Sequence, residues 1–176
     1  MINRIPFEWI ANRKNLIGVE IGVDQAFNAL NILENLDIKK LYLIDPYYSY
    51  GGFNGKGVLD PARDDEDLEN LYQEALDRLS KHTYKLVWLK ELSETAVDKV
   101  EDNLDFIYLD GNHRYEYVLK DLELYYPKVK SGGLVAGDDF QLEGVQKALR
   151  AFEPIHETRI SHNRDAKQLS WGLIKK

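Results

Sequence analysis

The sequence of 176 residues contains no cysteine, which excludes disulfide bonds, a cysteine nucleophile and thiolate metal sites. It has no apolar run of roughly 18 residues, as a membrane span requires, and residues 1–15 carry no apolar core typical of a signal peptide. Basic residues are the minority, with 23 Lys and Arg against 30 Asp and Glu, so the formal net charge is -7. Phosphate backbones require a basic face. We therefore expect a cytoplasmic protein whose main partner is neither nucleic acid nor a membrane.

Apolar segments alternate with amphipathic segments along the chain. The apolar segments, which we interpret as strands, are residues 16–23, 39–47, 85–89, 104–110 and 131–140. The amphipathic segments, which we interpret as helices, are residues 24–36, 68–79, 93–100, 115–126 and 142–152, and Asp24 is placed to cap the first of them. Residues 154–161 and 167–176 resemble a closing hairpin. This alternation predicts one α/β domain with a parallel sheet covered by helices on both faces.

Acidic residues stand at or near the end of every predicted parallel strand. They occur in the segments "EIGVDQA", "LIDPY", "ELSE", "DGNH" and "GDDF". Each acid alone is typical of a helix cap or a turn. Because the carboxyl ends of parallel strands share one edge, where ligands bind, the acids together predict that a cation, ligand hydroxyl groups or a water network accepts their charges.

Two residues at these strand ends, a glycine and an acid, indicate a nucleoside ligand. Gly22 follows the first strand, where a glycine lets a ligand approach the backbone. The other glycines of a dinucleotide fingerprint are missing. Asp45 comes 23 residues after Gly22, at the end of the second strand, where an acid suits the two hydroxyls of a ribose. The spacing favours a nucleoside over a dinucleotide.

The segments "VEIGVDQAFNAL", "LYLIDPY", "LSETAV", "DFIYLDGNHRYEYVLKDLELYYPKVKSGGLVAGDDF" and "LSWGLIKK" resemble the motifs of class I S-adenosylmethionine-dependent methyltransferases. The nearest branch is the small-molecule O-methyltransferases, which include catechol-type and macrocin-type sugar enzymes. The resemblance covers residues 16–176. It implies a Rossmann-like, seven-stranded, mostly parallel sheet of order 3-2-1-4-5-7-6 whose seventh strand is antiparallel. Residues 1–176 would form a single domain in which residues 1–15 are a short N-terminal cap.

The resemblance also implies roles for individual residues. Glu20 and Gly22 would line the methionine part of the cofactor, Asp45 would hold the ribose, and Ser93 and Glu94 would lie beside the adenine. Asp110 would lie below the sulfonium and bind a divalent cation together with Asp138 and Asp139. His113 stands where catechol-type enzymes carry a basic lysine, which makes it a candidate general base.

Two positions depart from the family pattern, which usually has glycine at Ala26 and a small hydroxyl residue at Asn28. An alanine at position 26 can crowd the cofactor or require a φ that alanine tolerates poorly. The loop after the second strand offers aromatic side chains that could stack on an acceptor or could instead cover the sheet edge, namely Tyr47, Tyr48, Tyr50 and Phe53.

The leading hypothesis is a methyltransferase that acts on a hydroxyl of a small molecule with help from Mg²⁺ or another divalent cation. Asp138 or Asp139 could instead cap the helix that follows, and His113 could position a ligand. Two other functions stay open, a non-catalytic nucleoside-binding module and a nicotinamide-dependent oxidoreductase. The missing glycines and the tail hairpin weigh against the oxidoreductase. A homodimer is compatible with the sequence.

Overall fold

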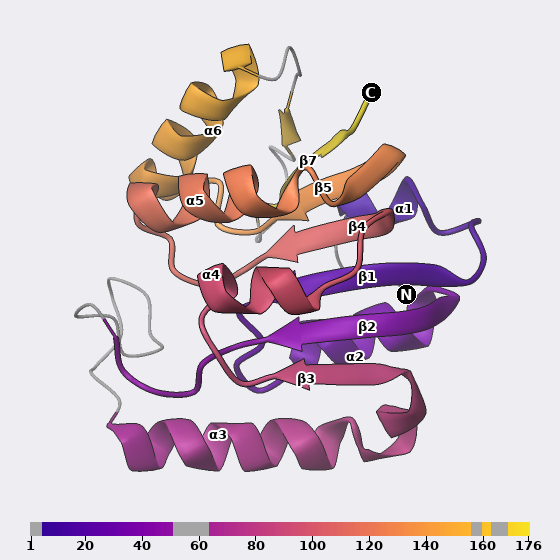
Figure 1. Cartoon of the computed structure of the whole chain (residues 1–176), viewed down its shortest axis with the longest axis vertical. Coiled ribbons are helices and arrows are strands. Elements are labelled where there is room, and N and C mark those ends of the chain that lie inside the picture. Colours follow the sequence, from indigo (N-terminus) through magenta and orange to yellow (C-terminus); the bar gives the residue numbers. More distant parts are fainter. Residues whose placement is uncertain (1–4, 51–63, 156–159, 163–168) are drawn as a thin grey trace.

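The computed structural model describes residues 5–50, 64–155, 160–162 and 169–176. Its centre is a seven-stranded sheet of order β3-β2-β1-β4-β5-β7-β6 (Figure 1), which confirms the predicted strand order. The strands are β1 (Leu16–Ile21), β2 (Ile38–Ile44), β3 (Leu86–Leu89), β4 (Leu104–Leu109), β5 (Val129–Gly137), β6 (Ser161–His162) and β7 (Trp171–Ile174). The first five strands are parallel, and β7 pairs with β5 and β6 in the antiparallel direction.

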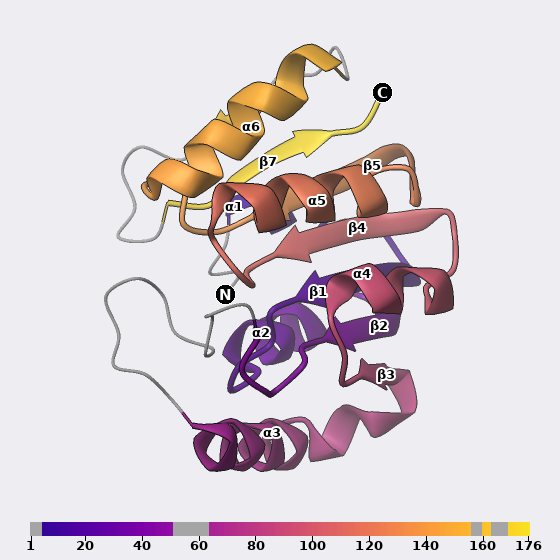
Figure 2. The same ribbon diagram turned by 60° about the vertical axis from the view of Figure 1, so that its left-hand side comes forward.

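Helices cover both faces of the sheet, as predicted (Figure 2). The helices are α1 (Ile5–Glu8), α2 (Phe27–Asn35), α3 (Asp65–Arg78), α4 (Ser93–Ala96), α5 (Tyr115–Tyr125) and α6 (Glu143–Ile155). One core holds buried side chains of the first three helices, and the other holds buried side chains of α4, α5 and α6. The strand β4 serves both cores, because Phe106 faces the first and Ile107 the second. This alternation explains why the central strands are apolar on both sides.

The N-terminal segment closes one core beside the centre of the sheet. Phe7 is fully buried, and its ring lies edge-on to Phe106 with the centroids 5.8 Å apart. It also lies 5.0 Å from the ring of Tyr108. These contacts bind the segment to β4 through apolar burial.

The structure corrects several predicted boundaries, including the start of the helix after β1 and the strand predicted for residues 154–161. The helix predicted to begin at Asp24 begins at Phe27, and its N-cap residue is Ala26, which makes no side-chain capping bond. The prediction of an Asp24 cap was therefore wrong. The α6 helix continues through Pro154 to Ile155, so the strand predicted for residues 154–161 shrinks to Ser161–His162. Within the described ranges, no helix is both long and apolar enough to cross a membrane.

Candidate active site

A cavity of about 300 Å³ lies at the carboxyl ends of the parallel strands. Its walls include all six residues that the sequence analysis assigned to the cofactor, Glu20, Gly22, Asp45, Ser93, Glu94 and Asp110. They come from the end of β1, the residues directly after β1 and β2, the start of α4 and the loop after β4. These segments are far apart in the sequence and meet at one edge of the sheet. The volume is at the lower end of the range of ligand pockets.

Asp45 fixes the turn that forms the floor of this cavity. Its Oδ2 atom accepts hydrogen bonds from the backbone N–H groups of Val23 (2.9 Å) and Asp24 (3.1 Å). Its Oδ1 atom accepts from the N–H of Tyr47 at 3.0 Å. Burial raises the pKa of Asp45 above its ordinary value, although these three hydrogen bonds lower it. The carboxylate predicted to hold a ribose therefore also orders the backbone around it.

The turn between β1 and α2 has three residues in the left-handed region, Gly22 (φ 84°), Asp24 (φ 47°) and Ala26 (φ 61°). The expected strain at Ala26 is therefore present, because a non-glycine residue seldom adopts this conformation. At Gly22 a Cβ atom would lie 2.4 Å from the backbone of Asp110 and Gly111. A glycine is thus required at position 22 by the neighbouring loop as well as by its φ.

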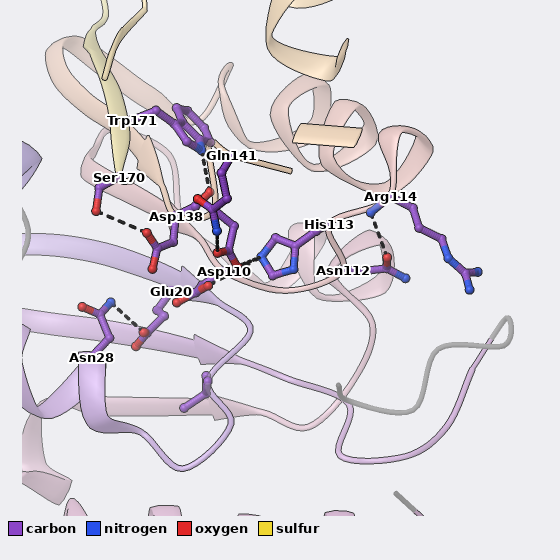
Figure 3. A network of polar contacts seen from close by, with 12 residues as sticks. Glu20, Asn28, Asp110, Asn112, His113, Arg114, Asp138, Gln141, Ser170 and Trp171 are labelled. Carbon is purple, nitrogen blue, oxygen red and sulfur yellow. Dashed lines mark hydrogen bonds and ion pairs between the residues drawn. The ribbon is translucent and has the colours of Figure 1, made fainter. Parts of the chain in front are cut away.

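Glu20 is almost completely buried at the end of β1. Its Oε1 atom accepts a hydrogen bond from Nδ2 of Asn28 at 2.9 Å (Figure 3). Asn28 is the position where the family usually has a small hydroxyl residue, and here its amide orients the carboxylate. Both side chains line the cavity.

At another part of the wall, Ser93 donates from Oγ to Oδ1 of Asp121, an acid on α5 that the sequence analysis did not select. Burial raises the pKa of Asp121 to about 7, while the Ser93 hydrogen bond and the charge of Lys120 lower it. Glu94, the second residue predicted beside the adenine, forms an ion pair with Lys120. The amphipathic pattern of residues 115–126 gave no signal for Asp121, because one acid within a helix is usually solvated.

Asp110, His113 and Asp139 form a compact group at the ends of β4 and β5. Each offers a ligand atom, and these atoms lie within 4.8 Å of one another. The Nε2 atom of His113 lies 3.1 Å from Oδ2 of Asp139 and 3.6 Å from Oδ1 of Asp110. Figure 3 shows the His113 ring pointing toward Asp110. Burial lowers the pKa of His113, but the two carboxylates outweigh it and the pKa is raised.

Asp138, which the sequence analysis also placed at the cation, is not a member of this group. Its backbone N–H continues the sheet by donating to the Leu109 carbonyl at 3.1 Å. Its Oδ1 atom accepts from Oγ of Ser170 at 3.3 Å (Figure 3). Asp139 adopts a left-handed φ of 56°, which breaks the extended path and lets it face His113 while Asp138 does not join the group. The sequence analysis placed both acids at the carboxyl edge of the sheet, but it did not distinguish the directions of their side chains.

Aromatic side chains form part of the same wall. Tyr47, Tyr48, Tyr50 and Tyr117 line the cavity, and the rings of Tyr50 and Tyr117 are 5.8 Å apart in an edge-on arrangement. Burial raises the pKa of Tyr50 well above its usual range. Three of the four aromatic residues expected on the loop after β2 thus reach the cavity, and Phe53 lies outside the described residues.

The strand order, with an antiparallel seventh strand, is the one that the resemblance to class I S-adenosylmethionine-dependent methyltransferases implied. A family model described as "Methyltransferase domain" matches residues 17–140. The chain belongs to this family. The match runs from the second residue of β1 to beyond the end of β5, and it contains all the predicted site residues, Asp138 and Asp139 included.

The chain is similar in sequence to two uncharacterized proteins. The chain is 27% identical over 135 residues to uncharacterized protein R132 of Acanthamoeba polyphaga mimivirus, a match that covers 73% of this chain and 53% of that protein. It is 32% identical over 88 residues to the uncharacterized ATP-binding protein MJ1609 of Methanocaldococcus jannaschii, covering 50% of this chain and 22% of that protein. The chain thus spans about half or less of the length of these relatives.

Solved structures show the same architecture at low sequence identity. SMU.1697c of Streptococcus mutans, described as a candidate methyltransferase in complex with SAH, has a TM-score of 0.70 at 11% identity and full coverage of both chains. Precorrin-6y C5,15-methyltransferase of Geobacter metallireducens has a TM-score of 0.69 at 11% identity, with 97% of this chain and 86% of that chain covered. An rRNA methylase of Streptococcus thermophilus has 0.66 at 12% identity, with 99% and 98% covered. At these identities the likeness concerns the fold alone.

Proposed function

We propose that this protein transfers a methyl group from S-adenosylmethionine to a hydroxyl group of a small molecule. The observation that carries the proposal is the cavity, because all six predicted cofactor residues line it and its wall reaches Asp110 and His113, which lie beside Asp139. A cofactor in this cavity would extend toward these three side chains, which could contact the oxygen of an acceptor hydroxyl.

The residues of the cavity match the chemistry of the cofactor. Glu20, oriented by Asn28, can accept hydrogen bonds from the amino group of the methionine part. Asp45 can accept from a ribose hydroxyl at Oδ1, since the turn occupies both lone pairs of Oδ2 but only one of Oδ1. Ser93 begins α4 beside the position proposed for the adenine.

The reaction is an in-line displacement at the methyl carbon. The acceptor oxygen forms a bond to that carbon as the carbon–sulfur bond breaks, and the electron pair of the broken bond stays on sulfur, which leaves S-adenosylhomocysteine. The acceptor hydroxyl loses its proton to solvent or to a nearby base. Because the sulfonium is already activated, the protein mainly has to align the acceptor and favour loss of that proton.

The donor set at the end of β4 fits a divalent cation, because two carboxylates and an imidazole lie close enough to bind one ion. When bound there, such a cation would lower the pKa of the acceptor hydroxyl. Asp110 and Asp139 contribute opposite charge to the ion, and Gln141 donates from Nε2 to the other oxygen of Asp139. This hydrogen bond would hold the carboxylate in place for the ion.

For the acceptor, we propose a small molecule with a flat or sugar-like face. Tyr48, Tyr50 and Tyr117 offer aromatic surfaces on the cavity wall, and such rings can stack on a ring-shaped acceptor. The net charge of -7 disfavours an RNA acceptor. A screen should still include RNA, because one neighbour of the same fold is an rRNA methylase.

Calorimetry with S-adenosylhomocysteine tests the proposal first. We expect one molecule to bind per chain, and absence of binding would remove the proposal. A screen of catechols, sugars, hydroxy acids and RNA with methyl-labelled cofactor then identifies the acceptor class. The Asp110→Asn variant should lose turnover, because the substitution removes a carboxylate of the proposed cation site. A protein that binds the cofactor but methylates none of these acceptors would instead support a non-catalytic binding module.

A further inference from the structure

We propose that Asp110, His113 and Asp139 form a three-ligand site that selects a first-row transition-metal dication, such as Mn²⁺, Fe²⁺, Co²⁺ or Zn²⁺, over Mg²⁺. In this arrangement His113 is a metal ligand and not the general base. The inference deepens the proposed function. The role of the ion in methyl transfer rests on that function, whereas the binding of the ion does not. The binding of the ion is measurable without any methyl transfer.

The distances within the group suit adjacent ligands on one ion. Two ligand atoms that each lie about 2.1 Å from an octahedral ion and occupy neighbouring corners are about 3.0 Å apart, and about 3.4 Å apart in a tetrahedral site. The observed separations from His113 Nε2 are 3.1 Å to Asp139 and 3.6 Å to Asp110. A shift of a few tenths of an ångström would bring each carboxylate oxygen to such a separation from His113 Nε2, and all three ligand atoms lie within 4.8 Å of one another. The opposite positions would remain open to acceptor oxygens or water.

The backbone holds the three ligands from two neighbouring strands. The β4 and β5 strands pair in parallel up to Leu109 and Gly137, so the residues that follow them leave the sheet side by side. The backbone N–H of Asp110 donates to the Ile21 carbonyl at 2.8 Å, which fixes the start of this loop against β1. His113 follows three residues later. The group therefore rests on the rigid centre of the sheet.

The site is sheltered but open on the side of the cavity. The side chains of His113, Asp110 and Asp139 are 15%, 22% and 32% exposed, respectively. His113 and Asp110 line the large cavity. An ion held there would face the space in which the acceptor must lie.

The second nitrogen of His113 also fits the role of a ligand. Among the described residues, the buried Nδ1 atom has no hydrogen-bond partner. His113 lines a second, small cavity of about 10 Å³ together with Asn112, Asp121 and Asp138. That volume is about what one water molecule needs. A histidine that binds a metal usually donates from its other ring nitrogen to water or a carboxylate, which fixes its tautomer.

The chemistry of the donors determines the selectivity. Mg²⁺ prefers oxygen ligands and retains several waters, so an imidazole contributes little to its binding. Imidazole suits Zn²⁺, Fe²⁺ and related ions, whose affinity for nitrogen and oxygen donors rises along the first row. A site with one nitrogen among three protein ligands should therefore favour these ions over Mg²⁺.

The competing explanation is that a protonated His113 only bridges two carboxylates and joins the β4 and β5 loops. Direct binding distinguishes the two explanations. The full chain, freed of metal by a chelator, is titrated with Mn²⁺, Co²⁺ and Mg²⁺ by calorimetry, and the visible spectrum of the Co²⁺ form is recorded. We expect one Co²⁺ or Mn²⁺ per chain, bound at least about tenfold more tightly than Mg²⁺.

Variants identify the ligands. His113→Gln should weaken Co²⁺ binding by about 10- to 100-fold and change its spectrum, whereas Mg²⁺ affinity should change much less. Asp139→Asn should weaken the binding of both ions, because it removes one carboxylate of the group. His82→Gln is the matched control at a position away from the cavity.

Three outcomes would overturn the proposal: no binding of Mn²⁺ or Co²⁺, tighter binding of Mg²⁺ than of either, or unchanged Co²⁺ binding in His113→Gln. Titration of the same preparation with S-adenosylhomocysteine separates the two proposals. Binding of the nucleoside without any of the metals would refute the metal site alone. Binding of a metal without the nucleoside would refute the methyltransferase function and leave the metal site in place.

Discussion

The Oδ2 atom of Asp45 accepts a hydrogen bond from the backbone N–H of Val23 at 2.9 Å, although 22 residues separate the two. The carboxylate at the end of β2 thereby holds the turn that follows β1, and Tyr47 is attached to its other oxygen. The turn carries left-handed residues that would be costly without such support. The proposed ribose site is therefore organised before any ligand arrives, which lowers the entropic cost of binding.

Asp45→Asn is expected to weaken binding of S-adenosylhomocysteine by about tenfold or more, because it removes the charge that strengthens hydrogen bonds to ribose hydroxyls. It should also lower the free energy of unfolding by about 1–3 kcal/mol, since the amide offers a donor where backbone N–H groups need an acceptor. Calorimetry and urea unfolding measure the two effects. Asp37→Asn, at an exposed acid 3.5 Å from Lys14, is the control and should change neither. Unchanged nucleoside affinity in Asp45→Asn would contradict the assigned role.

The sequence predicted the edge of the sheet that carries the site, because that prediction needs only the order of the strands. Once the alternating pattern indicated a parallel sheet, acids at strand ends had to meet, as Glu20, Asp45 and Asp110 do. The strand order itself came from the resemblance to a family, since periodicity does not reveal which strand lies next to which.

The direction of individual side chains could not be predicted in the same way. Asp138 and Asp139 are neighbours in sequence, but their side chains have different partners. Asp138 accepts from Ser170, whereas Asp139, which has a left-handed φ, faces His113. The start of α2 was misplaced for a similar reason, because the turn at Ala26 depends on hydrogen bonds to Asp45 from the other side of the site. Asp121 was missed because its burial results from the packing of α5 against α4, where Ser93 donates a hydrogen bond to its carboxylate. These features depend on tertiary contacts that no local pattern records.

A second prediction concerns Gly22, whose φ of 84° and contact with the Asp110–Gly111 backbone impose separate requirements. Gly22→Ala should lower the free energy of unfolding by more than about 3 kcal/mol, because the new Cβ meets backbone atoms that cannot rotate away. Gly132→Ala is a matched control, since Gly132 has a similar φ of 76° but nothing within 4 Å of the added Cβ. It should cost only about 1 kcal/mol of conformational strain. Urea unfolding of both variants gives the difference, and equal losses would show that the contact with the Asp110 loop is unimportant.

The last prediction concerns the pH dependence of stability that Asp121 causes. Its pKa is about 7 in the folded protein, against 3.8 for an unperturbed aspartate, because the carboxyl is buried. Between these values the folded state keeps a proton that the unfolded state has lost. The contribution of Asp121 to stability is therefore complete below about pH 4, falls as the pH rises through 7, and is constant above that.

Asp121→Asn removes this titration while keeping the size of the side chain and an oxygen that can accept the hydrogen bond from Ser93. The free energy of unfolding of the variant minus that of the original protein should therefore increase from pH 4 to pH 7 and level off above pH 8. Urea unfolding at several pH values measures the difference, and groups common to both proteins, including His113, cancel in it. A flat difference for Asp121→Asn would mean that Asp121 is already ionised in the folded protein near pH 5, and that its pairing with Ser93 and Lys120 outweighs its burial.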